Sequence, residues 1–162
     1  MTQKAIADEP YEFTFDSEST ALRIIDVQRD FGEPGSFGEA RGNDVTPLQA
    51  VIAPCKRVRG AARRTGMMVI HTREGHSPDP ADCPPSKIVR GRGATRIGDP
   101  GPMGRILVRG NRGYECVVLA DCVGSYFPEF QRVALEMIKA QGGIFGWVSD
   151  SKRALPAMEA AA

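Results

Sequence analysis

The sequence predicts an α/β fold built on a parallel β-sheet, for three reasons. Two short apolar runs, residues 21–26 (ALRIID) and 67–71 (MMVIH), have the length and composition of buried strands. A helical pattern lies between them, and the same strand–helix–strand order returns in the second half of the chain. A strand, a crossover helix and a second strand form a right-handed βαβ unit, in which the two strands run parallel.

The first crossover helix carries clear start and stop signals. Thr46 is expected to be its N-cap, with Pro47 at the first helical position and Gln49 completing a capping box. Pro54 is expected to kink this helix, and Gly66 to end it. The residues that form its predicted apolar face are Leu48, Val51, Ile52, Cys55, Val58 and Ala62.

The second βαβ unit is predicted from residues 115–122 (ECVVLADC) and 144–150 (IFGWVSD) as strands. Pro128 is expected to open the helix between them, and the QGG sequence at residues 141–143 to end it. One apolar face of this helix is predicted to consist of Phe130, Val133, Ala134, Met137 and Ile138.

We expect a single domain over residues 1–162, with an N-terminal half at 15–110 and a C-terminal half at 111–152. The Ala-rich residues 153–162 are expected to be a frayed tail. Residues 75–113 are rich in Pro, Gly and Arg and too long for an ordinary connection. Such a loop is either functional or a sign that the elements are misassigned.

Composition narrows the class of protein. The 41% hydrophobic and 25% charged residues are typical of a soluble globular chain, and a net charge of +1 gives no reason to expect nucleic acid or a membrane as partner. No apolar run approaches the roughly 20 residues that span a bilayer, and residues 1–13 lack a signal-peptide core, so we expect a cytoplasmic protein. The four cysteines are irregularly spaced and are expected to be reduced thiols: Cys55, Cys83, Cys116 and Cys122.

Ligands of parallel α/β sheets bind at the carboxyl ends of the strands, which makes Asp26, His71 and Asp121 the positional candidates. Asp26 could act as a general base or could cap a loop, and its position does not decide between them. Cys116, which opens the strand at residues 116–120, is expected to be a small core residue, whereas Cys122, at the end of the ECVVLADC run, lies past that strand and is a weak candidate nucleophile.

Two other sequence patterns suggest a binding site at first sight, but each favours a simpler interpretation. HTREGH, from His71 to His76, is not the helical HExxH pattern and no second ligand cluster follows, so we expect no bound metal. Residues 87–112 contain a group of Lys and Arg residues but a single acid, Asp99. A solvated loop is favoured over a specific anion-binding site for this segment. These cations are Lys87, Arg90, Arg92, Arg96, Arg105, Arg109 and Arg112.

Several segments together resemble the isochorismatase-like cysteine hydrolases, in the branch that includes biuret amidohydrolase and ureidoacrylate-type amidases. They are ALRIIDVQRDFGEPGSFG, VIHTREGHSPDPADCPPSK, RIGDPGPMGRILVRG, NRGYECVVLADCVGSYFPEF and ALEMIKAQGGIFGWVSDS, which occur in the family's order and cover most of residues 10–152. The resemblance implies a three-layer α/β/α parallel sheet and hydrolysis of a C–N bond in a small amide or ureido substrate. It also implies a homo-oligomer without metal or cofactor.

The family uses an Asp, a Lys and a Cys. The Asp takes the thiol proton, the Lys favours the thiolate, and backbone N–H groups beside the Cys hold the oxyanion. The resemblance assigns the Asp role to Asp26, a pocket-lining role to Phe31, and contact with a urea-like substrate to Gln141.

One part of the family pattern is missing between Gly110 and Asn111. Family members carry there a DKP segment with the catalytic Lys and a strand that ends in the nucleophilic Cys, on the order of 60 residues for two strand–helix units. Neither Cys116 nor Cys122 aligns with that Cys, and Lys139, like Lys87, does not match the Lys. The sequence is therefore consistent with an omitted segment, a true deletion, or a degenerate relative retained for binding.

The missing segment between Gly110 and Asn111 has a consequence for the predicted sheet. The strand at residues 116–120 must either move next to the first strand or leave a gap in the sheet. Two functions follow as expectations: a C–N hydrolase whose active site is incomplete as written, or a catalytically silent remnant that binds a small ligand or family subunits. Anion or nucleic-acid binding through the cation group is a third possibility, which salt-dependent retention on a polyanion would test.

Overall fold

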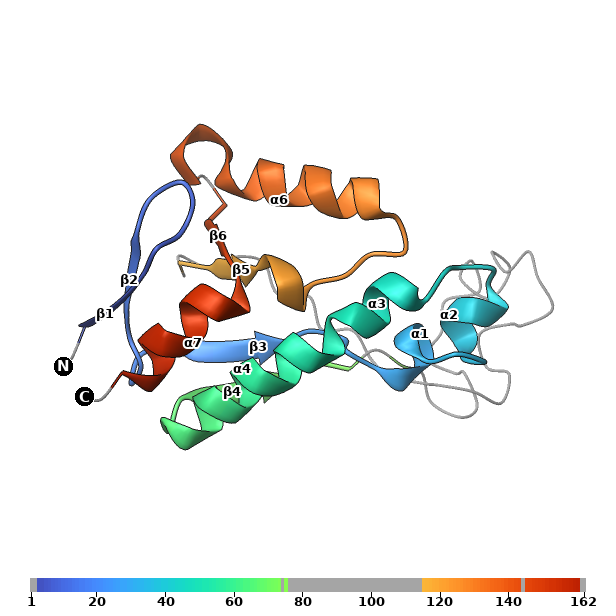
Figure 1. The fold of residues 1–162 in the computed structure, drawn as a ribbon, viewed down its shortest axis with the longest axis horizontal. Helices are drawn as coiled ribbons and strands as arrows, with labels where there is room; N and C mark the ends of the chain where they lie inside the picture. Colours follow the sequence, from blue (N-terminus) through green and yellow to red (C-terminus); the bar gives the residue numbers. More distant parts are fainter. Residues whose placement is uncertain (1–2, 74, 76–114, 144, 161–162) are drawn as a thin grey trace.

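The computed structural model describes residues 3–73, 75, 115–143 and 145–160 (Figure 1). Residue 76 and the predicted loop and cation group that follow it, together with the junction at Gly110 and Asn111, lie outside the described residues. The elements are β1 (Gln3–Ile6), β2 (Phe13–Asp16), β3 (Ala21–Ile24), α1 (Arg29–Gly32), α2 (Phe37–Ala40), α3 (Thr46–Ala50), α4 (Ile52–Arg64), β4 (Met68–His71), β5 (Val117–Leu119), the 3₁₀ turn η1 (Ala120–Cys122), α6 (Pro128–Gly143), β6 (Trp147–Ser149) and α7 (Ser151–Glu159). Within the described residues, none of the helices is long and apolar enough to cross a lipid bilayer.

Both predicted βαβ units are present. Strand β3 pairs with β4 in parallel, with Ala21 opposite Met68, and α3 and α4 form the crossover. Strand β5 pairs with β6 in parallel, with Val117 opposite Trp147, and α6 forms the crossover. Among the described strands, no hydrogen-bonded ladder joins β3–β4 to β5–β6. Among the described strands, β5 therefore does not lie hydrogen-bonded next to β3, the first of the two expected arrangements, but is separate from it.

The core lies where α4 and α7 pack together over the strands. Ala61 and Ala62 of α4 are fully buried, and Val58 is 2% exposed. On α7, Ala154 and Met158 are buried one turn apart and join the same cluster. Small residues on α4 allow the two helices to approach closely, because no long side chain holds them apart.

The prediction of a frayed tail at residues 153–162 is wrong over its described part. Helix α7 runs from Ser151 to Glu159, and the carboxylate of Asp150 caps it by accepting the backbone N–H of Arg153. Ala154 and Met158 then fall on one face and reach the core. The apolar spacing outweighs Pro156, which sits inside the helix.

The first crossover helix differs from its predicted form at two places. Thr46 is the first helical residue rather than the cap, and its backbone N–H donates to Asp44 Oδ1 at 2.9 Å. The helix divides into α3 and α4 at Val51. This break is one turn before Pro54, which has no N–H to offer to the Ala50 carbonyl. The helix is thus interrupted at Val51, which itself keeps a right-handed helical conformation, and the kink at Pro54 stays a prediction.

An N-terminal hairpin, not predicted from the sequence, closes one end of the molecule. Strands β1 and β2 pair antiparallel, and the buried Lys4 donates from Nζ to the carbonyl oxygen of Met158 at 2.8 Å. Glu9 then forms an antiparallel bridge with Val148 of β6, with N–O distances of 3.1 and 3.0 Å. The hairpin thereby ties the start of the chain to the second βαβ unit and to α7.

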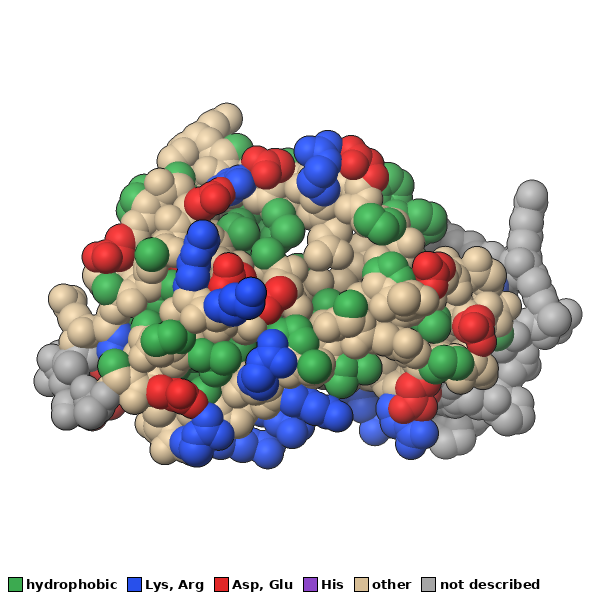
Figure 2. Space-filling model, viewed as in Figure 1, with side chains coloured by type: hydrophobic (Ala, Val, Ile, Leu, Met, Phe, Trp, Pro, Cys, Tyr) green, Lys and Arg blue, Asp and Glu red, His purple; other side chains and the backbone are tan. Residues whose placement is uncertain are grey.

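The predicted apolar face of α6 is largely uncovered. Phe130 is 66% exposed and Met137 is 58% exposed, whereas Ile138 of the predicted face and the nearby Leu135 are half-buried. Figure 2 shows hydrophobic side chains on the surface at the start of this helix. The helix pattern was therefore predicted correctly, but most of the predicted face does not turn to the interior.

Candidate functional site

The carboxyl ends of β3 and β4 meet at Asp26 and Thr72. Asp26 has a φ of 51°, a left-handed conformation that Asp and Asn adopt more readily than most residues. The Thr72 hydroxyl donates to Asp26 Oδ1 at 2.7 Å, and Asp26 donates its backbone N–H to Thr72 Oγ1 at 3.1 Å. Thr72 is itself held by its N–H, which donates to the Ile24 carbonyl at 2.9 Å. The half-buried carboxylate is thus fixed by both strand ends.

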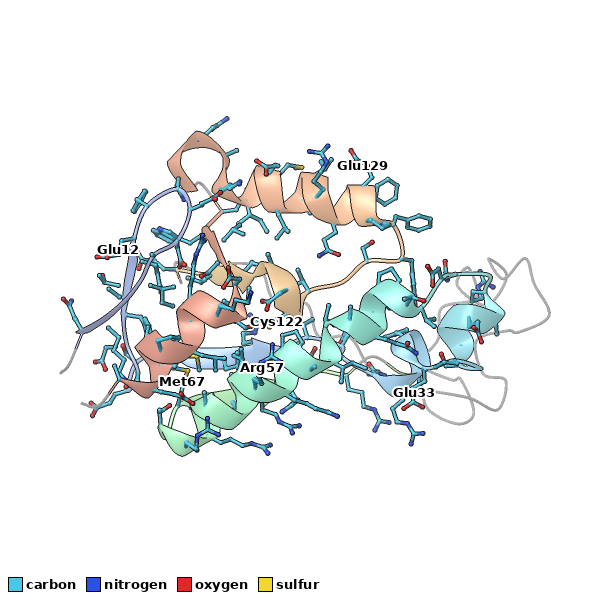
Figure 3. The ribbon with its side chains drawn as sticks, in the orientation of Figure 1. Glu12, Glu33, Arg57, Met67, Cys122 and Glu129 are labelled. Atoms are coloured by element: carbon cyan, nitrogen blue, oxygen red, sulfur yellow. The ribbon has the colours of Figure 1, made fainter. Side chains whose placement is uncertain are left out.

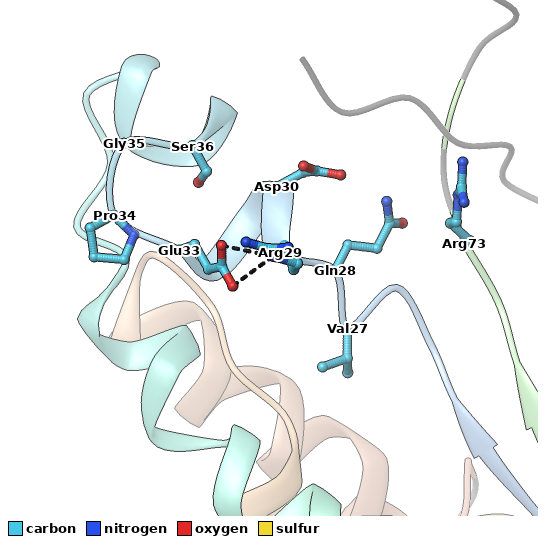
Figure 4. A pocket seen from close by; sticks show the side chains of 9 residues that line it. All are labelled: Val27, Gln28, Arg29, Asp30, Glu33, Pro34, Gly35, Ser36 and Arg73. Atoms are coloured by element: carbon cyan, nitrogen blue, oxygen red, sulfur yellow. Dashed lines mark hydrogen bonds and ion pairs between the residues drawn. The ribbon is translucent and has the colours of Figure 1, made fainter.

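An open hollow of about 640 Å³ begins directly after these two residues (Figure 4). It is lined by Val27, Gln28, Arg29, Asp30, Glu33, Pro34, Gly35, Ser36 and Arg73. Arg29 Nε lies 2.8 Å from Glu33 Oε1 on its wall. The lining therefore offers guanidinium, amide and carboxylate groups, which suit a small polar molecule with both donors and acceptors.

Phe31 lies on α1, beside this hollow rather than in its lining. The side chain is half-buried, and the Tyr126 hydroxyl donates to the Phe31 carbonyl oxygen at 2.9 Å. Burial raises the pKa of Tyr126, so its hydroxyl stays protonated as the donor. Gly38 closes the contact, because a Cβ there would lie 2.5 Å from both the Phe31 and Tyr126 oxygens. The pocket-lining role of Phe31 stays a prediction.

Gln141 is not brought to the same place. It is exposed in the turn that ends α6, with a φ of 53°. That turn leads into β6, where Trp147 donates its N–H to the Cys116 carbonyl at the start of β5, at 2.9 Å. Gln141 therefore lies near the amino ends of these strands, whereas Asp26 follows a carboxyl end. Figure 1 shows the end of α6 and helix α1 on opposite sides of the molecule. A substrate contact by Gln141 stays a prediction without support from this arrangement.

Asp121, the strand-end carboxylate after β5, anchors a helix. Its Oδ1 accepts the backbone N–H of Ser151 at 2.8 Å, and its Oδ2 accepts the hydroxyl of the same residue. The Cys122 thiol donates to Oδ1 at 3.7 Å. Both oxygens of Asp121 thus hold the start of α7, with the fully buried Ser151, to the end of β5.

The surroundings of Cys116 and Cys122 differ from those expected. Cys116 is exposed, so the prediction of a core residue is wrong: β5 begins only at Val117 and leaves Cys116 outside the packed strand. Cys122 is half-buried beside Cys55 of α4. A hydrogen bond with Cys55, burial, and the negative charges of Cys55 and Asp121 raise the pKa of Cys122 well above its usual range. Cys122 is therefore poorly suited to supply a thiolate nucleophile.

The histidine pattern does not assemble a metal site in the described part of the chain. His71 is the exposed last residue of β4, and its partner His76 lies outside the described residues. No group of three or more His, Cys, Asp or Glu side chains placed to hold a metal occurs among the described residues.

Two residues of this region were not singled out from the sequence. Thr72 directly follows the second apolar strand, and a hydroxyl at that place is a ready partner for the carboxylate that ends the adjacent parallel strand. That pairing could have been inferred from the order of the elements. Tyr126 lies in a loop without such a pattern, and only the fold places it next to Phe31.

Comparison with known proteins gives the fold. No family model matches the chain. A solved structure of a cysteine hydrolase from Pseudomonas syringae pv. phaseolicola 1448A is similar over 100% of both chains, with a TM-score of 0.70 and 14% sequence identity. At 14% sequence identity, this similarity shows the fold alone. The protein shares the mixed α/β fold of that cysteine hydrolase, which confirms the α/β fold class predicted from the sequence.

Proposed function

We propose that the protein is an isochorismatase-like cysteine hydrolase that binds a small amide or ureido substrate of the biuret type and acts on its C–N bond. The main support is the position of Asp26, a half-buried carboxylate at the carboxyl end of β3 and next to a polar hollow. The fold shared with a cysteine hydrolase is consistent with this chemistry. The proposal includes a cytoplasmic homo-oligomer that needs no metal or cofactor.

The reaction would use Asp26 as general base. Its carboxylate would take a proton from a thiol, and the thiolate would attack the carbonyl carbon of the substrate. Within the described residues, no cysteine contacts Asp26: Cys122 donates to Asp121, and Cys55 donates to the Cys122 carbonyl. The chain as written should therefore bind substrate but turn it over slowly, with a deficit of about 10⁴- to 10⁶-fold for a lost nucleophile.

Binding and turnover can be measured separately on the 162-residue chain. Ligand-detected NMR with biuret, ureidoacrylate-like and nicotinamide-like amides should show binding of at least one ureido compound, which Asp26→Asn weakens and the distant control Glu12→Gln does not. Absence of binding across this panel would contradict the proposed substrate class. Ammonia release should stay at background, and release above background that thiol alkylation abolishes would mean that Cys122 or Cys116 has become the nucleophile.

A second function, association with subunits of its own family, is favoured by the exposed face of α6. Phe130 and Met137 of this helix, and Phe127 directly before it, are each more than half exposed, and Val133 is 40% exposed. A contiguous apolar patch of this kind is typical of a protein-binding surface, and a second copy of this chain is its simplest occupant.

Light scattering across a concentration series tests this association. The native chain should form dimers or larger oligomers, and Phe130→Ser and Met137→Gln should shift it toward monomer. Glu136→Gln, on the same helix but outside the patch, is the matched control. A monomer at all concentrations, or oligomers that both patch variants retain, would exclude the α6 face as the contact.

A further inference from the structure

We propose that Cys55 and Cys122 form a reversible intrachain disulfide, a modification site that is independent of the proposed hydrolase chemistry. The two residues are far apart in sequence but adjacent in the fold. Cys55 lies on α4 of the first βαβ unit, and Cys122 ends η1, directly after β5 of the second. Figure 3 shows Cys122 next to α4.

The fold brings the two cysteines into contact. The Cys55 Sγ donates to the Cys122 carbonyl oxygen at 3.3 Å. Both residues are half-buried, so a small reagent can reach them while a second protein is less able to do so. Contact between two cysteines that are each held by packed elements favours an intrachain bond over an intermolecular one.

The two thiols are not equivalent, and their difference assigns the chemical roles. Interaction with the Cys122 side chain lowers the pKa of Cys55, and interaction with Cys55, together with burial, raises the pKa of Cys122. Cys55 is therefore the thiol that ionises first and attacks, and Cys122 is the one that resolves the intermediate.

The oxidant is a low-molecular-weight disulfide of the glutathione class. The Cys55 thiolate attacks one of its sulfurs, breaking that S–S bond and releasing one thiolate, which takes up a proton. Once Cys55 is part of the mixed disulfide, its negative charge, one cause of the raised pKa of Cys122, is gone. The Cys122 thiol then gives up its proton and attacks the Cys55 sulfur, which breaks the mixed disulfide. The second small thiolate leaves with the Cys122 proton, so two protein thiols are oxidised and one small disulfide is reduced to two thiols.

Such a bond would join the two βαβ units covalently. No strand ladder joins the units within the described residues, where their contacts include α4 with the η1 region and the Tyr126 hydroxyl with the Phe31 carbonyl. Oxidation should therefore raise the melting temperature, and reduction should restore the original value. In cytoplasmic proteins a disulfide of this kind is typically transient and redox-responsive rather than a permanent staple.

The test equilibrates the full chain with oxidised glutathione and maps its peptides without reduction. The expected result is a Cys55–Cys122 peptide pair, a fall from four to two titratable thiols, and a melting temperature that rises and is reversed by dithiothreitol. Cys55→Ser and Cys122→Ser should each abolish the effect, while Cys116→Ser should retain it. Four thiols after equilibration, a stable glutathione adduct on Cys55, or a pair that involves Cys83 or Cys116 would overturn the proposal. Because the map is made on the native chain, the result does not depend on whether the variants fold.

Discussion

Replacement of Thr72 by Val removes the hydroxyl that fixes Asp26 and keeps the shape of the side chain. The native hydroxyl takes part in two hydrogen bonds, one donated to Asp26 Oδ1 at 2.7 Å and one accepted from the Asp26 N–H at 3.1 Å. Thr72→Val deletes both. It also releases a residue that is held at a φ of 51°, where extended conformations compete once the hydroxyl is gone.

The expected loss follows from the two bonds. A hydrogen bond to a charged acceptor contributes about 1.5–3 kcal/mol and a neutral one about 0.5–1.5 kcal/mol. Both groups of Asp26 are only half-buried, so water replaces part of each bond in the variant. A net loss of about 2 kcal/mol in the free energy of unfolding is expected, equivalent to a fall of roughly 4–8 °C in the melting temperature of a chain of this size.

Thermal unfolding followed by circular dichroism measures this loss. Thr72→Ser is the matched control, because it keeps the hydroxyl and removes only a methyl group, so it should stay closer to the native melting temperature than Thr72→Val. Equal melting temperatures for the two variants would refute the reasoning. They would mean that the methyl group, rather than the contact with Asp26, accounts for the contribution of Thr72.

Three further substitutions have defined outcomes, each read from unfolding midpoints. Asp8 is 9% exposed, its oxygens have no hydrogen-bond partner among the described residues, and burial raises its pKa. A raised pKa means that the folded state favours protonated Asp8. This contribution to the free energy of unfolding is complete below the ordinary Asp pKa of about 3.9 and is lost as pH rises through the pKa of the folded state. Asp8→Asn should therefore stabilise the protein more at pH 7 than at pH 4, and a difference that does not change with pH would contradict this cause. Gly146→Ala should cost about 2–4 kcal/mol, because its Cβ would lie 2.3 Å from the Cys116 carbonyl oxygen at a φ of 137°; a neutral effect would mean that the β5–β6 pair can shift apart. Gly60→Ala should instead stabilise by about 0.5–1 kcal/mol, since the nearest atom to the new Cβ is the tip of Arg64 at 3.3 Å; destabilisation would show that this tip cannot move.

The elements that the sequence predicts well are those with strong periodic signals. The runs at residues 21–26 and 67–71 became β3 and β4, and Pro128 opens α6 as expected. The N-terminal hairpin was missed because QKAI and FTFD are short, and their alternation becomes apparent only when the two strands pair. Helix α7 was mistaken for a tail because its Ala-rich composition and Pro156 obscure the spacing of Ala154 and Met158.

The candidate site was predicted unevenly for a similar reason. The position of Asp26 follows from the strand-end rule, which depends only on the order of elements. The surroundings of Asp121 and Cys122 depend on which helices pack against the end of β5. Both α7 and α4 pack there, and no local sequence pattern predicts this. The exposure of Phe130 likewise depends on what lies beside α6 rather than on the residues of that helix.

The separation of the β3–β4 pair from the β5–β6 pair has a consequence for how the native state opens. Amide protons in a continuous sheet are released together, whereas those of two pairs without a common ladder can exchange with deuterium through different openings. Helix α4 contacts β3, β4 and η1, so its buried turns around Val58 and Ala61 should be the slowest to exchange. The β5–β6 pair, covered on one side by a helix with no buried residue, should exchange first while α4 remains protected. The protein would then behave as two cooperative units that share one helix.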